Sequence, residues 1–121
     1  MPPKKILLVD DDLSLLDGVG DRLRSYGLKV RCEATAAGCF SALSQEVPDL
    51  VLLDIQLPDG NGLDLLSHIR AHHPALPVLM VSSVRGVEKE ALRRGATGFL
   101  AKPFRGEDLK QAVLQALRET G

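Results

Sequence analysis

The chain has 121 residues, of which 45% are hydrophobic and 26% charged, and its 15 basic and 16 acidic side chains give a formal net charge of -1. This length and composition fit one compact globular domain and exclude a disordered chain. The charge balance offers no global field for nucleic acid or a membrane, and no stretch approaches the roughly 20 apolar residues that cross a bilayer. The first residues, MPPKK, also lack a signal-peptide pattern, so we expect a cytoplasmic protein without direct nucleic-acid or membrane contacts.

The N-terminal part of the chain alternates between strand and helix patterns. ILLV (residues 6–9) is a continuous apolar run, which is typical of a strand covered on both faces. Apolar residues at helical spacing follow it over residues 16–26. LKVRCE (residues 28–33) alternates apolar with charged side chains, which predicts an edge strand with one solvated side. A second helical stripe covers residues 36–43.

The rest of the chain repeats this alternation three times. Its strand and helix patterns are LVLL (50–53) with 65–69, VLMV (78–81) with 87–92 and GFLA (98–101) with 109–117. The last helix has the strongest amphipathic pattern. The order is therefore (βα)5, which predicts an α/β fold with a doubly wound, five-stranded parallel sheet and helices on both faces. In such sheets ligands bind beyond the carboxyl ends of the strands.

Four residues mark expected helix ends. Asp12 and Thr35 belong to the residue types that favour helix N-caps. Gly27 and Gly95 follow helical stripes at positions where a left-handed C-cap is expected.

The two cysteines and three histidines form no pattern typical of disulfides or metal ligands. Cys32 and Cys39 are too few for a disulfide framework and lack a typical zinc spacing, so we interpret them as buried reduced thiols. His68, His72 and His73 are interpreted as surface residues rather than ligands.

Polar side chains stand where the predicted central strands end. They are Asp10, Asp11 and Asp12 after residues 6–9, Asp54 after 50–53, Ser82 after 78–81 and Lys102 after 98–101. Adjacent carboxylates repel one another, so a bound cation or a helix-capping turn must compensate. A helix cap explains Asp12, whereas the carboxylates of the other aspartates form an oxygen-rich cluster that suits Mg²⁺. Because an aspartate can be a phosphoryl nucleophile and a lysine can neutralise the transferring group, the pattern favours phosphoryl chemistry.

The motifs ILLVDDD, VLLDIQLPDGNG, VLMVSS and GATGFLAKPF, in this order, resemble those of a bacterial two-component response-regulator receiver domain. The resemblance covers essentially the whole chain. It implies a flavodoxin-like fold with strand order 2-1-3-4-5, one receiver domain over residues 1–121 and no effector domain in this chain.

The resemblance also implies roles for individual residues. Asp54 would be the phosphoacceptor, Lys102 would face the phosphoryl group, and Ser82 and Phe99 would form the switch. The implied Mg²⁺ ligands are Asp10, Asp11, Asp54 and the backbone carbonyl of Gln56. A cis peptide bond between Lys102 and Pro103 is also expected, because X-Pro bonds adopt cis at low cost.

The implied partners are a sensor histidine kinase or phosphotransfer protein, and a downstream effector domain or protein. Phosphorylation would remodel a face formed by residues 87–94, Phe99 and 107–118. The resemblance leaves open whether phosphorylation also produces a homodimer. The implied role is regulatory: the chain would catalyse only its own phosphorylation and dephosphorylation.

The sequence departs from the family pattern near the fourth helix. Ser82 and Lys102 are 20 positions apart, an interval shorter than in a typical member, which predicts a trimmed fourth helix or preceding loop. Ser83 stands where a small alanine is common. Gln56 and Val84 are expected to tune the phosphoryl lifetime by shaping the access of water.

Two alternatives belong to other classes. DDDLS also fits the start of a haloacid-dehalogenase-like phosphatase, with Asp10 as nucleophile and Asp12 as acid/base, but no acidic motif follows a later strand and a cap domain has no room. The other alternative is a receiver-like interaction domain that works without phosphorylation. The complete acidic set argues against it, and the short fourth-helix region argues for it.

Overall fold

A five-stranded parallel sheet forms the centre of the protein in a computed structural model that describes residues 2–118. The strands are β1 (Lys5–Val9), β2 (Lys29–Glu33), β3 (Leu50–Leu53), β6 (Val78–Ser82) and β7 (Gly98–Ala101). The helices are α1 (Leu13–Ser25), α2 (Ala36–Gln45), α3 (Gly62–His72), α4 (Glu88–Arg93) and α5 (Gly106–Arg118). The strand order β2-β1-β3-β6-β7 confirms the predicted flavodoxin-like 2-1-3-4-5 topology, counted over the strands of this sheet.

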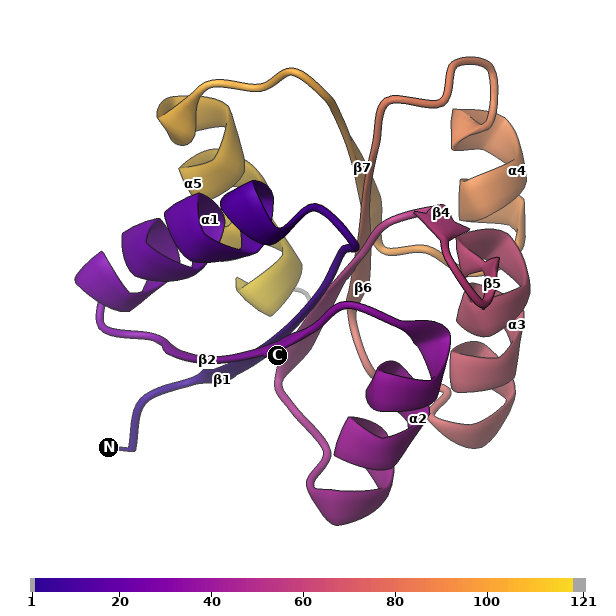
Figure 1. Cartoon of the computed structure of the whole chain (residues 1–121), viewed down its shortest axis with the longest axis horizontal. Helices are drawn as coiled ribbons and strands as arrows, with labels where there is room; N and C mark the ends of the chain where they lie inside the picture. Colours follow the sequence, from indigo (N-terminus) through magenta and orange to yellow (C-terminus); the bar gives the residue numbers. More distant parts are fainter. Residues whose placement is uncertain (1, 119–121) are drawn as a thin grey trace.

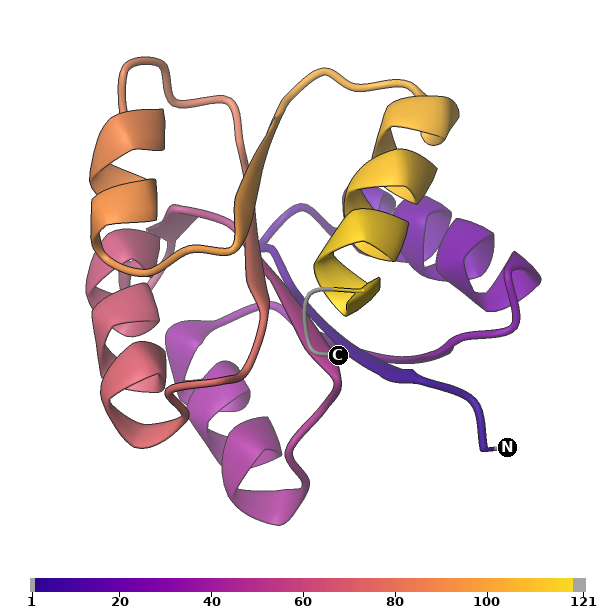
Figure 2. The ribbon, with the colours of Figure 1, turned by 180° about the vertical axis from the view of Figure 1, so that it is seen from behind.

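The helices cover both faces of the sheet, as Figure 1 shows with α1 and α5 on one side and α2, α3 and α4 on the other. Figure 2 shows the same division from behind. Neighbouring residues of β1 serve different faces: Ile6 and Leu8 pack with α1 and α5, and Leu7 and Val9 pack with α2 and α3. Because successive side chains of a strand point to opposite faces, a continuous apolar run is needed to fill both layers.

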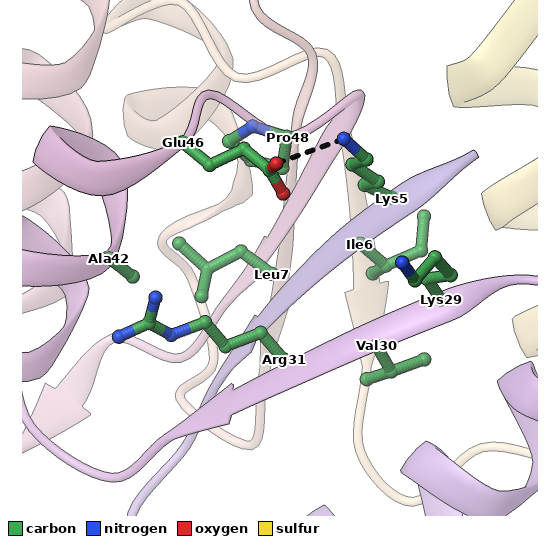
Figure 3. A pocket seen from close by; sticks show the side chains of 9 residues that line it. All are labelled: Lys5, Ile6, Leu7, Lys29, Val30, Arg31, Ala42, Glu46 and Pro48. Carbon is green, nitrogen blue, oxygen red and sulfur yellow. Dashed lines mark hydrogen bonds and ion pairs between the residues drawn. The ribbon is translucent and has the colours of Figure 1, made fainter. Parts of the chain in front are cut away.

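The edge position of β2 is confirmed. Lys29 and Arg31 are exposed, whereas β1, β3 and β6 are almost wholly buried. A hollow of about 140 Å³ lies at this edge, near the amino ends of β1 and β2 (Figure 3). In it Lys5 Nζ bonds Glu46 at 2.9 Å. Arg31, which also lines the hollow, donates to Gln45 at 2.9 Å, so these two cations lie at the C-terminal end of α2.

The predicted helix ends are confirmed. The Asp12 carboxylate accepts a hydrogen bond from the Leu15 N–H, and the Thr35 hydroxyl accepts one from the Gly38 N–H. Gly27 and Gly95 have φ angles of 85° and 102°, the left-handed conformation that glycine adopts without a steric penalty.

Two features differ from the sequence interpretation. Cys39 is buried, but Cys32 lies on the edge strand and is only half-buried, so the prediction of two buried thiols is wrong for Cys32. A hairpin of two two-residue strands, β4 (Gln56–Leu57) and β5 (Gly60–Asn61), also follows β3, where no strand was predicted. The expected trimming of the fourth-helix region fits α4, which has six residues and no side-chain cap at its N-cap residue, Val87.

Candidate functional site

The carboxyl ends of four strands of the sheet bring the predicted site residues together. Asp10 follows β1, Asp54 follows β3, Ser82 ends β6 and Lys102 follows β7. Asp10 and Asp54 are 1% and 6% exposed, and Ser82 is 1% exposed, although all three are polar. Burial of this kind is costly unless each group has a partner, so the contacts of these side chains identify the site.

Lys102 lies between the two buried carboxylates. Its Nζ is 2.7 Å from Asp10 Oδ2 and 3.5 Å from Asp54 Oδ2. The other oxygen of Asp10 accepts a hydrogen bond from the Asp12 N–H at 2.9 Å, and Asp54 Oδ1 accepts one from the Ile55 N–H at 2.7 Å. Each buried carboxylate therefore has one backbone donor and shares a single ammonium group, which leaves the pair short of positive charge.

The pKa directions express this shortage. Burial, followed by the neighbouring charge of Asp10, raises the pKa of Asp54, and the ammonium of Lys102 offsets only part of the rise. Burial alone would lower the pKa of Lys102, but its bond to Asp10 and the charges of Asp54 and Asp10 outweigh burial and raise it. Lys102 therefore stays charged at neutral pH. The ionised form of Asp54 is disfavoured by burial and by the charge of Asp10, and a second cation nearby would stabilise it.

Three carboxylates could supply that relief by holding a metal ion. Oxygen atoms of Asp10, Asp11 and Asp54 all lie within 4.8 Å of one another, and Asp11 is the exposed member. Hard carboxylate oxygens suit Mg²⁺, and exposed Asp11 leaves one side of the cluster open to the waters that this ion keeps. The donor set therefore fits a magnesium ion.

The segment after Asp54 makes structural contacts beside the site that sequence reasoning missed. Gly62 begins α3 directly against the Asp54 backbone, where an added Cβ would overlap the Asp54 carbonyl oxygen and come within 2.6 Å of Ile55 Cα. Asp59 accepts hydrogen bonds from the N–H groups of Ala36 and Ala37 at 2.7 and 3.0 Å, and these bonds lower its carboxyl pKa. The segment PDGNG signals a turn, but no local pattern indicates these contacts with α2 and with Asp54.

The remaining predicted residues lie around this centre. The Ser82 hydroxyl accepts a hydrogen bond from the Val84 N–H at 3.1 Å, while Ser83 is exposed. Phe99 lies half-buried in β7 and packs against the core under α2, α3 and α4. Gln56 is exposed at the start of β4, two residues after Asp54. The peptide bond between Lys102 and Pro103 is cis, as expected.

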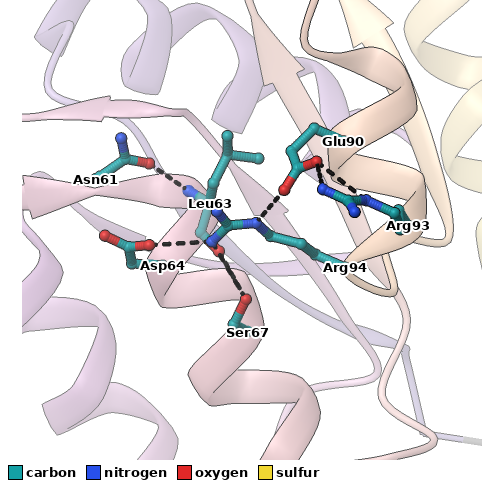
Figure 4. A network of polar contacts seen from close by, with 7 residues as sticks. All are labelled: Asn61, Leu63, Asp64, Ser67, Glu90, Arg93 and Arg94. Atoms are coloured by element: carbon teal, nitrogen blue, oxygen red, sulfur yellow. Dashed lines mark hydrogen bonds and ion pairs between the residues drawn. The ribbon is translucent and has the colours of Figure 1, made fainter.

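A polar network beside the site joins α4 to α3 (Figure 4). The Arg94 guanidinium donates to Glu90 Oε1 at 2.9 Å and to Asp64 Oδ1 at 3.0 Å, and Asp64 belongs to α3. Arg93 also bonds Glu90, so the two arginines lower the Glu90 pKa, and Glu90 and Asp64 raise that of Arg94. Arg70 fixes the following turn by donating to the Gly95 carbonyl at 2.7 and 3.0 Å.

The fold and this site define a class of protein: a flavodoxin-like α/β domain with an acidic, lysine-containing site at the carboxyl edge of its sheet. Residues 6–114 match the family model of the response regulator receiver domain. The chain therefore belongs to the response-regulator receiver family, as predicted. None of the helices within residues 2–118 has both the length and the hydrophobicity needed to span a bilayer.

Curated relatives are longer than this chain. The probable transcriptional regulatory protein TcrX of Mycobacterium tuberculosis is 34% identical over 121 residues, which cover 98% of this chain and 52% of TcrX. The transcriptional regulatory protein ZraR of Salmonella typhimurium is 35% identical over 96% of this chain and 27% of ZraR. The chain thus spans about half the length of the first relative and about a quarter of the second.

Solved structures of similar size show the same fold. A CheY-like receiver domain protein from Methanospirillum hungatei superposes with a TM-score of 0.92 at 32% identity, covering 98% of this chain and 96% of that one. The receiver domain of NtrX from Brucella abortus gives a TM-score of 0.88 at 37% identity, covering 93% and 98%. Receiver domains of response regulators are regulatory units, and this assignment extends to the present chain.

Proposed function

We propose that Asp54 accepts a phosphoryl group from a phosphohistidine of a sensor histidine kinase or phosphotransfer protein. The observation that carries this proposal is the position of Asp54, a carboxylate that is almost fully buried, beside two further acids and one lysine. In the reaction a carboxylate oxygen of Asp54 forms a bond to phosphorus as the phosphorus–nitrogen bond of the donor breaks. The released imidazole nitrogen then takes up a proton.

A bound Mg²⁺ ion completes the proposed site. The carboxylates of Asp10, Asp11 and Asp54 and the backbone carbonyl of Gln56 would hold it, and the close approach of the three carboxylates supports this ligand set. When bound, Mg²⁺ neutralises charge on the phosphoryl oxygens. Lys102 supplies the second positive charge, because its ammonium group already lies 3.5 Å from Asp54 and would meet a phosphoryl oxygen there.

The proposed switch connects this site to the surface. The Ser82 hydroxyl, now bonded to the Val84 N–H, would turn towards the new phosphoryl group, and half-buried Phe99 would turn inward with it. Movement of Phe99 would change the face of α4, β7 and α5, which we assign to a downstream effector domain or protein, or to a second copy in a phosphorylation-dependent homodimer. Gln56 and Val84 would set the phosphoryl lifetime.

This proposal gives residues 1–121 the role of one receiver domain that acts in the cytoplasm with its kinase. Its catalysis is limited to its own phosphorylation and dephosphorylation. The phosphatase alternative lacks support, because its acid/base, Asp12, is exposed and caps α1. Turnover of a phosphomonoester that depends on Asp10 but not on Asp54 would revive it.

Incubation with acetyl phosphate, followed by intact mass measurement, tests the proposal. The wild type should gain one phosphoryl group with Mg²⁺ and none with excess EDTA. Asp54→Asn should gain none, whereas Asp59→Asn, which changes an exposed acid five positions later, should still be modified. An unmodified wild type, or a phosphoryl group that survives Asp54→Asn, would contradict the assignment.

A further inference from the structure

A pair of histidines lies on the exposed side of α3, away from the acidic site. His68 and His72 are four residues apart, and in a helix this spacing places two side chains on one face. Both are exposed, and with His73 they line one surface hollow of about 260 Å³ between α2 and α3. Three imidazoles therefore border a single hollow, although none of them contributes to the proposed phosphorylation site.

The two rings are held in position by their neighbours. The rings of His68 and His72 are stacked with centroids 4.2 Å apart and planes 29° apart. Phe40 of α2 holds the other side of His68 in an edge-to-face contact with centroids 4.7 Å apart. This contact places the His68 ring beside α2, on the side of α3 where the hollow lies.

A hydrogen bond determines which nitrogen of His72 is free. His72 Nδ1 lies 2.9 Å from the backbone carbonyl oxygen of His68. Because a carbonyl can only accept, the proton of the neutral ring resides on Nδ1, and Nε2 keeps its lone pair. Metal-binding histidines typically donate their second nitrogen to a carbonyl or carboxylate in this way, which fixes the tautomer and increases the basicity of the ligating nitrogen.

We propose that His68 and His72 form a binding site for a divalent transition-metal ion of the Zn²⁺ class. Zinc binds imidazole nitrogen at about 2.0–2.1 Å, so two tetrahedral ligands lie about 3.3 Å apart. The ring centroids are 4.2 Å apart, and because each nitrogen lone pair lies in the plane of its ring, rotation about the side-chain bonds turns one nitrogen of each ring towards a shared ion. Water fills the remaining positions of this open site. We thereby revise the interpretation of these two histidines as surface residues without a ligand role.

The site is distinct from the acidic cluster in position and chemistry. α3 begins beside Asp54 and reaches His72 ten residues later, about 15 Å further along at the rise of an α-helix. Imidazole nitrogen favours zinc, copper or nickel, whereas the three carboxylates favour Mg²⁺. Zinc at the histidines is therefore independent of the phosphorylation of Asp54.

Titration with Zn²⁺, followed through the histidine ring signals by NMR in excess Mg²⁺, tests the site. We expect saturable shifts of the His68 and His72 signals at one equivalent of Zn²⁺. His68→Gln and His72→Gln should each lower the affinity by at least about tenfold. Both side chains are exposed, so the variants should remain folded.

His73→Gln is the matched control, because His73 borders the same hollow but stands outside the pair. Its affinity for Zn²⁺ should equal that of the wild type, and Asp54→Asn should likewise keep the histidine response. Unchanged His68 and His72 signals on addition of Zn²⁺, or an equal loss of affinity in His73→Gln and His72→Gln, would overturn the proposal.

Discussion

The carboxyl edge around Asp54 and the flank formed by α4 and β7 are built in opposite ways. At the carboxyl edge, β3 and β6 are buried throughout. Asp10 and Asp54, which lie at this edge, each accept a hydrogen bond from a backbone N–H and contact the Lys102 ammonium group. On the flank, β7 is only partly buried, and Ala91 is the sole buried residue of α4. Leu92, in the same helix, is 46% exposed.

This difference indicates which region can change conformation at a small free-energy cost. Displacing a residue of the carboxyl edge disturbs a close-packed core, whereas α4 buries only Ala91 and is also held by polar contacts such as Arg94 with Asp64. Ion pairs at the surface contribute little, and segments with few buried apolar contacts open most readily. The proposed chemistry thus takes place on rigid elements, and the proposed response occurs on a loosely held one.

The largest expected effect comes from filling the space beside Asp54. Gly62→Ala should destabilise the protein by about 3 kcal/mol or more, because the new Cβ overlaps backbone atoms that cannot turn aside. Gly18→Ala, in α1 with no atom within 4 Å of its added Cβ, is the matched control and should stabilise by about 1 kcal/mol. Urea denaturation measures both. Equal effects would show that the edge is no more rigid than an exposed helix.

Removal of the shared cation should have the next largest effect. Lys102→Met leaves two buried carboxylates without their ammonium partner and should destabilise the Mg²⁺-free protein by about 3 kcal/mol. Added Mg²⁺ should recover part of this loss. Lys110→Met removes only a contact 5.5 Å above the Tyr26 ring and should cost about 0.5 kcal/mol. Thermal melts with and without Mg²⁺ provide the measurement. A loss of stability that Mg²⁺ does not reduce would contradict the idea that the two carboxylates depend on a shared cation.

A smaller effect should appear in the pH dependence. Because the pKa of Asp54 is raised above its ordinary value of 3.8, the folded state binds the proton more tightly than the unfolded state. The resulting stability is fully present below pH 3.8 and is lost as pH rises through the folded-state pKa. Without Mg²⁺, Asp54→Asn should therefore be more stable than the wild type at pH 7 and should lose this advantage on acidification. Denaturation of both proteins between pH 3 and 7 measures this. A difference in unfolding free energy that stayed constant over this range would contradict the prediction.

The smallest effect is expected on the flank. Arg94→Gln removes the ion pair between α4 and α3 and should speed amide hydrogen exchange in α4 with little change in global stability. Arg93→Gln is the matched control, because Arg93 is 76% exposed and pairs only within α4. High salt should shrink the difference between the variants, since it screens exposed pairs. Equal exchange in both variants would show that Arg94 does not hold α4.

Much of this architecture could be predicted from local patterns. The four apolar runs predicted four strands of the sheet, and the alternation in residues 28–33 predicted the fifth, an edge strand. The cap positions Asp12 and Thr35 followed from residue type alone. The hairpin β4–β5 escaped prediction because strands of two residues are too short to show a period, and Cys32 escaped because burial at an edge depends on what covers it.

By itself the sequence determined the order of the elements, the faces that they bury and the edge at which the acids gather, because hydrophobic periodicity and the succession of elements can be read along the chain. Only the tertiary structure decided which groups touch. Lys102 meets Asp10 across 92 positions, Gly62 closes on the backbone of Asp54, and Phe40 of α2 orders His68 of α3. Such contacts depend on the packing of whole elements, which no window of neighbouring residues contains.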